Sequence, residues 1–224
     1  MEYRFSGDDG IDSWKEVNLV YSAALKQMET KMEILNEEFQ HVHQYNPIEH
    51  IKARMKTPES IVKKLKRHGR ESTIENMVNH INDIAGIRII CSFTSDIYRI
   101  AEMIREQKDL KVIGTKDYIT YPKASGYRSY HMIVSVPVYL SDRIVDAKVE
   151  VQIRTVAMDF WASLEHKIHY KLEGDAPEHI RYELIECARM VMDLDARMLS
   201  LNEQILQTSM EKALAKEQEK KNNK

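Results

Sequence analysis

The segment IVDAKVEVQIRT, residues 144–155, alternates apolar and polar residues along its whole length. Successive side chains of a β-strand point to opposite faces of a sheet, so this pattern predicts a strand with one buried face. The apolar face would carry Val145, Ala147, Val149, Val151 and Ile153. The other face would carry Asp146, Lys148, Glu150, Gln152 and Arg154. This polar face is either solvated or lines a cleft with Glu150 at its centre.

A second alternating strand is predicted over residues 127–139. Its apolar face would consist of Tyr130, Met132, Val134, Val136 and Val138, and its other face of Ser129, His131, Ile133 and Ser135. If the two strands pair, His131 and Glu150 face the same side of the sheet.

Further strands and helices are expected in the middle of the chain. The β-branched run IRIICSF, residues 87–93, predicts a buried central strand, and residues 111–118 predict another. Helices are expected at 60–68, 73–82, 95–107 and 156–170, and a loop at 121–126. We therefore expect an α+β fold with a mixed β-sheet covered by helices.

Heptad-spaced apolar residues at both ends predict two long helices, at 11–45 and 177–214. Asn46-Pro47 ends the first, because proline disfavours helix in the residue before it. We divide the chain into an N-terminal helical segment (1–46), a core (47–175), a C-terminal helix for packing or oligomerisation (176–210) and a disordered tail (211–224).

Composition excludes several classes of protein. Lys and Arg number 33 against 35 Asp and Glu, so a uniformly basic nucleic-acid binder is not expected. The two cysteines, Cys91 and Cys187, are far apart, which argues against a disulfide framework or a cysteine zinc site and favours the cytoplasm. No apolar run approaches the roughly 18 residues of a membrane span.

Positive charge is concentrated in residues 52–70, which hold eight Lys and Arg against one acid, Glu59. This density suits a polyanion, either nucleotide phosphates or a nucleic-acid backbone, or else it forms a solvated basic helix face. Ser60 could cap or line the start of the helix within this segment.

Asp83 lies directly before the predicted central strand. An acid in this place is either a turn residue or a ligand that holds a metal together with Glu150. Mg²⁺ takes one or two carboxylates and completes its shell with phosphate oxygens and water, so the pair would suit Mg²⁺. His166 and His169 lie three residues apart on a helix, but without a third ligand zinc binding there is not favoured.

Three segments together resemble the RelA/SpoT alarmone synthetases, in particular the small stand-alone members of the RelP type. They are GIRIIC after Asp83, KDYITYPKASGYRSYH, and VEVQIRTVAMDFWASLEHKIHYK. The resemblance implies that the mixed sheet has a nucleotidyltransferase-like fold. It also implies a cytoplasmic, Mg²⁺-dependent GTP pyrophosphokinase, which transfers pyrophosphate from ATP to the 3′-hydroxyl of GTP or GDP. It also implies a homotetramer. No His-Asp dipeptide occurs, and the length leaves no room for a hydrolase domain, so we expect no alarmone hydrolysis.

The resemblance also implies roles for individual residues. The ATP site would use Arg54, Lys56, Ser60, Lys64 and Arg88. The GTP site would use Lys116, Lys123, Tyr127, His131 and Gln152, with Tyr127 stacked on the guanine. Asp83 and Glu150 would be the catalytic and metal-binding acids, and Glu150 would share the metal or take the proton of the ribose 3′-hydroxyl.

Two other functions stay open from the residues. An RNA-binding module would use the basic segment 52–70, and its affinity for RNA would depend steeply on salt. A helical oligomer without a site would tolerate changes at Asp83 and Glu150.

Overall fold

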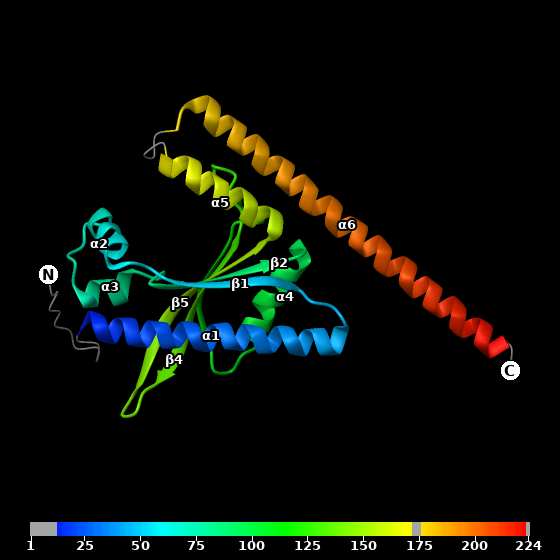
Figure 1. Cartoon of the computed structure of the whole chain (residues 1–224), viewed down its shortest axis with the longest axis horizontal. Helices are drawn as coiled ribbons and strands as arrows, with labels where there is room; N and C mark the ends of the chain where they lie inside the picture. Colours follow the sequence, from blue (N-terminus) through cyan, green and yellow to red (C-terminus); the bar gives the residue numbers. More distant parts are fainter. Residues whose placement is uncertain (1–12, 172–175, 223–224) are drawn as a thin grey trace.

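A computed structural model describes residues 13–171 and 176–222, and these residues form five strands and six helices (Figure 1). In chain order they are α1 (Trp14–His43), β1 (Ile48–Met55), α2 (Pro58–Arg67), α3 (Ile74–His80), β2 (Ala85–Cys91), α4 (Thr94–Arg105), β3 (Lys111–Asp117), β4 (Tyr130–Tyr139), β5 (Ile144–Thr155), α5 (Val156–Lys171) and α6 (Glu178–Asn222). The predicted α+β class with a mixed sheet and long end helices is confirmed.

The strands form one sheet in the order β1-β2-β5-β4-β3. β2 and β5 are parallel, and the other neighbouring pairs are antiparallel. The predicted pairing of the two alternating strands is found, with His131 opposite Gln152. The first of them begins at Tyr130 rather than Tyr127, because the chain is still in an irregular loop at residues 127–129.

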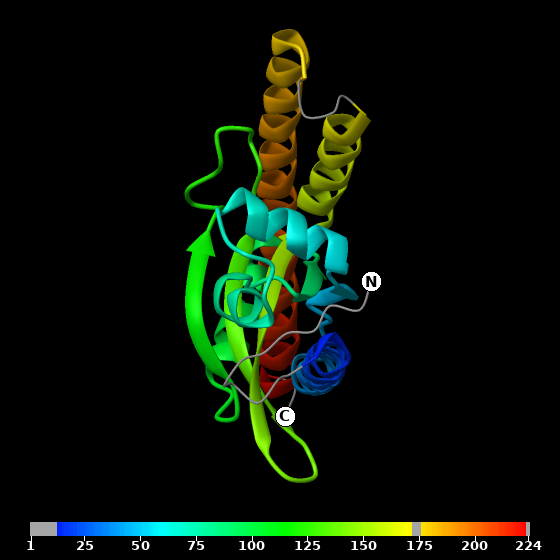
Figure 2. The same ribbon diagram turned by 90° about the vertical axis from the view of Figure 1, so that its left-hand side faces the viewer.

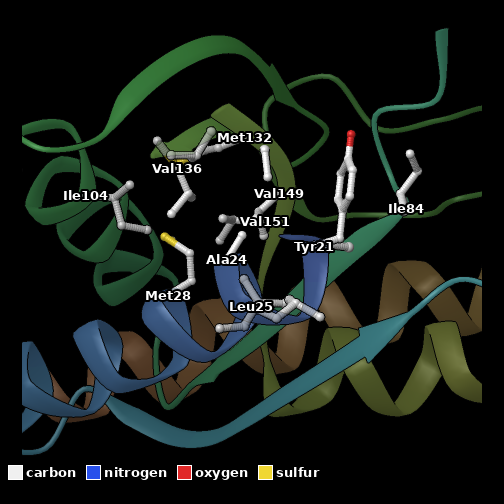
Figure 3. Packing of buried hydrophobic residues seen from close by; sticks show 14 of the residues in the cluster. Tyr21, Ala24, Leu25, Met28, Ile84, Ile104, Met132, Val136, Val149 and Val151 are labelled. Carbon is white, nitrogen blue, oxygen red and sulfur yellow. The ribbon is translucent and has the colours of Figure 1, made fainter. Parts of the chain in front are cut away.

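The apolar face of the sheet is covered by α1 and α4. Figure 3 shows Tyr21, Ala24, Leu25 and Met28 of α1 and Ile104 of α4 packed against Met132, Val136, Val149 and Val151 of the sheet. Each of these strand side chains is nearly or fully buried. Full burial of a side chain of this size stabilises the fold by about 1.5–3 kcal/mol. Because the apolar face is covered, only the opposite, polar face of the sheet can bind a molecule.

Strand β1 was not predicted from the sequence. Its residues IEHIKARM do not alternate, and most are exposed because β1 is an edge strand. Edge strands with charged side chains lack the periodic apolar signal of a half-buried strand. The consequence is that Lys52 and Arg54 lie on the sheet itself rather than in a loop before the basic helix.

Helix α6 is longer than expected. We predicted a disordered tail from residue 211, whereas the helix continues to Asn222. Its last turns, EKALAKEQEKKN, consist mainly of strong helix formers and contain neither Gly nor Pro. In Figure 1 its C-terminal part (red) extends away from the sheet, and in Figure 2 its N-terminal part lies beside α5. Among the described residues, no helix combines the length and the apolar character needed to cross a bilayer.

Candidate functional site

One row of polar side chains crosses all five strands on the face opposite α1. The strand registers place Lys52 beside Arg88, Arg88 beside Gln152, Gln152 beside His131, and His131 beside Lys116. Residues at matched register positions share a face, so these five side chains form a line across the sheet. The interpretation of the polar side of residues 144–155 as the wall of a site is therefore favoured over a plain solvated face.

A cleft opens on the β1–β2–β5 part of this face. It is lined by Lys52, Ala53, Arg54, Asp83, Gly86, Ile87, Arg88, Glu150 and Gln152. Glu150 is the register partner of Gly86, which has no side chain to fill the space beside the carboxylate. Arg54 lies beyond Gly86 on the edge strand. The cleft thus combines two carboxylates with several cationic side chains.

Asp83 is held by two lysines from separate elements. Lys56, which follows β1, donates from Nζ to Asp83 Oδ2 at 2.8 Å, and Lys64 of α2 donates to Oδ1 at 2.8 Å. Burial pushes the pKa of Asp83 upward, but the two ammonium groups outweigh it and hold the pKa below its usual range. The Asp83 side chain keeps 15% of its surface exposed, so it still faces the cleft.

Glu150 accepts hydrogen bonds on both carboxylate oxygens. Gln152 Nε2 donates to Oε2 at 2.8 Å, and His131 Nδ1 lies 3.3 Å from Oε1. Burial and the nearby charge of Asp83 raise the pKa of Glu150, yet His131 and Gln152 bring it below its usual range. Asp83 and Glu150 line the same cleft, so the two acids can face one bound ion or molecule.

Tyr127 stands beside this cleft, at the end of the 121–126 loop. Its hydroxyl contacts Arg154 Nη2 at 2.5 Å and His131 Nε2 at 2.9 Å. Lys123 Nζ lies 4.7 Å from the centre of its ring, within range of a cation–π contact. The Tyr127 ring therefore lies between cationic groups, and a planar aromatic molecule could stack on the ring face that Lys123 now covers.

Helix α6 packs against the loop that carries Tyr127. Gly126 has a φ of +88°, and a Cβ on it would lie 2.6 Å from Ala188 Cβ of α6. Trp161 of α5 donates from Nε1 to the carbonyl of Leu184 at 2.9 Å, and its side chain belongs to the same small apolar cluster as Ala188 and Tyr127. The position of Tyr127 thus depends on how α5 and α6 pack.

Asp159, in the first turn of α5, connects the cleft to the tyrosine. Its Oδ1 accepts from Arg88 Nη1 at 3.0 Å and from Arg154 Nη1 at 3.1 Å. One carboxylate oxygen therefore orients two guanidinium groups, one on β2 and one on β5. Sequence reasoning assigned no role to Arg154 or Asp159. The polar row gave a signal for Arg154, whereas nothing in the local pattern indicated Asp159.

The remaining predicted residues differ in how closely they join the site. Lys116 lies in the polar row but its side chain is exposed at the β3 end. Ser60 is exposed on α2 and does not cap the helix, because the cap is Thr57, whose Oγ1 accepts from the Ser60 N–H at 3.3 Å. The helix begins at Pro58, because proline is favoured in the first turn of a helix. The cap is therefore the residue before Pro58, which is Thr57.

The residues present suit a magnesium ion bound together with phosphates. Asp83 and Glu150 supply two carboxylates on one cleft, which is the usual protein share of a Mg²⁺ shell. Among the described residues, no group of three or more His, Cys, Asp or Glu could hold a metal by itself. The side chain of His169 lies outside the described set, so the His166–His169 pair gains no support as a zinc site.

Comparison with known proteins identifies relatives over most of the chain. Residues 53–175 match the family described as "Region found in RelA / SpoT proteins". The chain is 49% identical over 195 residues to the GTP pyrophosphokinase YwaC of Bacillus subtilis strain 168, covering 87% of this chain and 93% of the relative.

Two solved structures are similar in fold as well as in sequence. Small alarmone synthetase 2 from B. subtilis superposes with a TM-score of 0.79 at 48% identity, covering 85% of this chain and 98% of the other. Small alarmone synthetase 1 from B. subtilis, bound to its product pppGpp, superposes with a TM-score of 0.80 at 33% identity, covering 86% and 97%.

Proposed function

The chain belongs to the RelA/SpoT family, and we propose that it is a GTP pyrophosphokinase, which transfers the pyrophosphate of ATP to the 3′-hydroxyl of GTP or GDP and releases AMP. One observation carries the proposal most directly. A carboxylate pair, Asp83 and Glu150, shares a cleft with Arg54 and Arg88 and lies next to Lys56 and Lys64. A relative of the same fold is bound to pppGpp, the type of product that this reaction yields.

The β1–β2 side of the cleft would hold ATP. A triphosphate requires several cationic groups in one place. Three segments supply them here: the end of β1 with the residue after it (Arg54 and Lys56), α2 (Lys64) and β2 (Arg88). In the structure both lysines are paired with Asp83, so ATP phosphates would take over part of their hydrogen bonding. Ser60, at the exposed start of α2, is assigned to this side only by the family resemblance.

The β4–β3 side would hold the guanosine nucleotide. Tyr127 offers an aromatic face for the guanine, and Lys123 would move from that face to the phosphates. His131, Gln152 and Lys116 follow one another along the polar row, between Glu150 and the β3 edge. A ribose placed above Glu150 would bring its 3′-hydroxyl between the two nucleotide sites.

The reaction forms a bond between the ribose O3′ and the β-phosphorus of ATP and breaks the bond from that phosphorus to the oxygen that bridges to the α-phosphate. The bridging oxygen leaves on AMP. The proton of the 3′-hydroxyl goes to Glu150, whose lowered pKa keeps the carboxylate ionised and therefore able to accept it. The remaining contribution of the protein is positioning and neutralisation of phosphate charge.

Asp83 and Glu150 would together hold Mg²⁺ when the nucleotide is bound. The ion would supply neutralisation of the phosphate oxygens and lower the pKa of the nearby hydroxyl.

The test is a product assay with ATP labelled in the β-phosphate, GTP and Mg²⁺. We expect AMP and a guanosine pentaphosphate in equal amounts, and GDP should give the tetraphosphate. Glu150→Gln keeps the shape of the side chain but removes the acceptor of the proton, so turnover should fall by at least about 10²-fold. Folded protein that yields ADP, or no guanosine product, would contradict the proposal.

RNA binding by residues 52–70 remains the alternative. Two of its cations, Lys56 and Lys64, are turned toward Asp83, which leaves Lys63, Lys66 and Arg67 exposed on α2. An RNA-binding protein would bind RNA tightly with a steep loss of affinity as salt rises, and it would tolerate Glu150→Gln.

Self-assembly and compartment are also proposed. Apolar side chains of α6 that repeat with heptad spacing are about half exposed, and they include Leu194, Met198, Leu201 and Ile205. A stripe of this kind suits self-assembly, and the family resemblance implies a homotetramer, with 176–210 as the assembly segment. Cys91 and Cys187 are both free thiols, in keeping with the cytoplasm.

A further inference from the structure

Five side chains of the site form a closed ring, which is joined by four hydrogen bonds and by the 3.3 Å contact of His131 Nδ1 with Glu150 Oε1. From Glu150 the ring runs through Gln152, Arg154, Tyr127 and His131 and returns to Glu150. Three of its members are alternate residues of β5, and His131 is the cross-strand partner of the middle one. Each side chain therefore contacts two others of the ring. If one of them must donate in a given contact, its neighbour must accept there, and this choice constrains the rest of the ring.

Arg154 is the one member that can only donate. A guanidinium has five N–H groups and no acceptor. Its Nη2 donates one hydrogen to Tyr127 Oη at 2.5 Å and the other to Gln152 Oε1 at 2.9 Å. Two routes therefore run from Arg154 to Glu150. The tyrosine arm passes through Tyr127 and His131, and the glutamine arm passes through Gln152. In both arms Arg154 is the first donor.

The tyrosine arm fixes the tautomer of His131. Because Tyr127 Oη accepts from Arg154, its own hydrogen is directed to His131 Nε2, 2.9 Å away. A neutral imidazole that accepts at Nε2 carries its hydrogen on Nδ1, and Nδ1 faces Glu150 Oε1. A doubly protonated imidazole would point a second donor at Tyr127 Oη and leave the tyrosine hydrogen without an acceptor among the described hydrogen bonds.

In the glutamine arm, too, each residue donates to the next one on the way from Arg154 to Glu150. Because Arg154 donates to the carbonyl oxygen of Gln152, the amide nitrogen is turned the other way and donates to Glu150 Oε2 at 2.8 Å. Both oxygens of Glu150 thus receive a donor from the ring. The carboxylate is held at two points, and its free lone pairs are directed away from the ring.

We propose that Arg154 is a positioning residue that orients Glu150 for the reaction, by setting the direction of both hydrogen-bonded arms that reach its carboxylate. This rests on the proposed function, in which Glu150 meets the ribose hydroxyl. Arg154 is suited to this role by its burial, since its side chain is 5% exposed, and by Asp159, which accepts from Nη1 and supplies the counter-charge. Lysine could not span three acceptors with one rigid planar group.

The first experiment reads the hydrogen-bond direction without any substrate. The ¹⁵N spectrum of the imidazole groups in nucleotide-free protein at neutral pH reports the tautomer of each histidine, and His131→Asn identifies the signals of His131. We expect the Nδ1–H tautomer in the wild type. Arg154→Gln replaces a pure donor by a group that can also accept, so we expect a mixture of tautomers. An Nε2–H or a doubly protonated His131 in the wild type overturns the proposal.

The second experiment measures catalysis and binding separately. A displacement of about 1 Å can cost on the order of 10² in rate, so Arg154→Gln should lower kcat by that order. Its affinity for an ATP analogue with a methylene group between the α- and β-phosphates should stay within about twofold, which a general structural defect would not allow. Arg154→Lys remains donor-only and should keep the Nδ1–H tautomer with a smaller loss of kcat.

Controls separate the possible failures. Arg99→Gln makes the same replacement on α4, away from the ring, and should leave tautomer and kcat unchanged. If Arg154→Gln does not fold, Tyr127→Phe keeps Arg154 but removes the hydroxyl that links it to His131 Nε2, and it should also release the His131 tautomer. Wild-type kcat together with an unchanged tautomer in either variant refutes the proposal. A wild type that makes no guanosine product refutes the proposed function, while the tautomer result still decides whether Arg154 sets the direction of the ring.

Discussion

Lys64 Nζ donates to Asp83 Oδ1 across 2.8 Å and thereby ties the basic helix α2 to the turn before β2. The lysine side chain is 25% exposed and the aspartate side chain 15%, so the pair faces the cleft rather than the core. Under the proposed function, this ion pair would order the site before the nucleotide binds and would keep a cation close to where a phosphate binds.

Lys64→Gln should weaken ATP binding more than it weakens the fold. Under the proposed function Lys64 contacts an ATP phosphate, and loss of such a contact costs about 1.5–3 kcal/mol, so the KM for ATP should rise by about tenfold or more. Steady-state kinetics with ATP varied at saturating GTP measures this. Lys63→Gln removes a neighbouring exposed cation of the same helix and should have little effect. Equal changes in the two variants would point to a general charge effect instead.

Acid should remove the stability that Asp83 contributes. Its folded-state pKa is held below the unfolded value of about 3.9, so the contribution is complete above that pH and is lost as pH falls through the folded pKa. Asp83→Asn removes the negative charge and replaces one of the two accepting oxygens by an NH₂ donor, so it should cost about 2 kcal/mol at pH 7. Denaturant unfolding from pH 7 to pH 3 should show this difference shrinking below pH 4. A difference that stays constant down to pH 3 would contradict the prediction.

Much of the fold could be predicted because its central strands bury one face. The strict alternation in β4 and β5 placed Met132 and Val149 inside and His131 and Glu150 on the other side, as observed. Strand β1 was missed because an edge strand buries too little to need alternation. The extent of α6 was underestimated, since the loss of an apolar stripe does not end a helix built from Ala, Lys, Glu and Gln.

The site was predictable to the extent that its residues lie on patterned strands or in family motifs. Glu150 and Gln152 followed from the polar row, and Asp83 from its place before a buried strand. The contacts of Asp159 with Arg88 and Arg154 could not be predicted, because they depend on how the first turn of α5 returns over the sheet. Long-range side-chain contacts of this kind leave no periodic trace in the sequence.

Under the proposed function, Gly126→Ala should weaken the binding of GTP more than the binding of ATP. A Cβ at this φ of +88° is strained and would lie 2.6 Å from Ala188 Cβ, so the loop that carries Tyr127 must shift. A cost of about 1.4 kcal/mol in the bound state corresponds to a tenfold rise in the KM for GTP, with the KM for ATP nearly unchanged. Kinetics with each nucleotide varied in turn tests this.

Two further variants separate the strain from the clash in the Gly126 experiment. Gly114→Ala is the matched control, because a Cβ there meets nothing within 4 Å. Adding Ala188→Gly to Gly126→Ala should restore part of the affinity by relieving the clash but not the backbone strain. If the double variant is no better than Gly126→Ala alone, contact with α6 does not position the loop.

Lysine on the apolar stripe of α6 should break the proposed assembly. Leu194 and Leu201 are each 52% exposed in the single chain, and burying them between copies would contribute about 25 cal/mol per Å² of apolar surface. Leu194→Lys with Leu201→Lys should therefore give a smaller species in light scattering coupled to size exclusion. Ala196→Lys with Ser200→Lys adds the same charge on the opposite side of the helix and should keep the assembly. Assembly that survives the first pair, or is lost in both, would show that this stripe is not the contact.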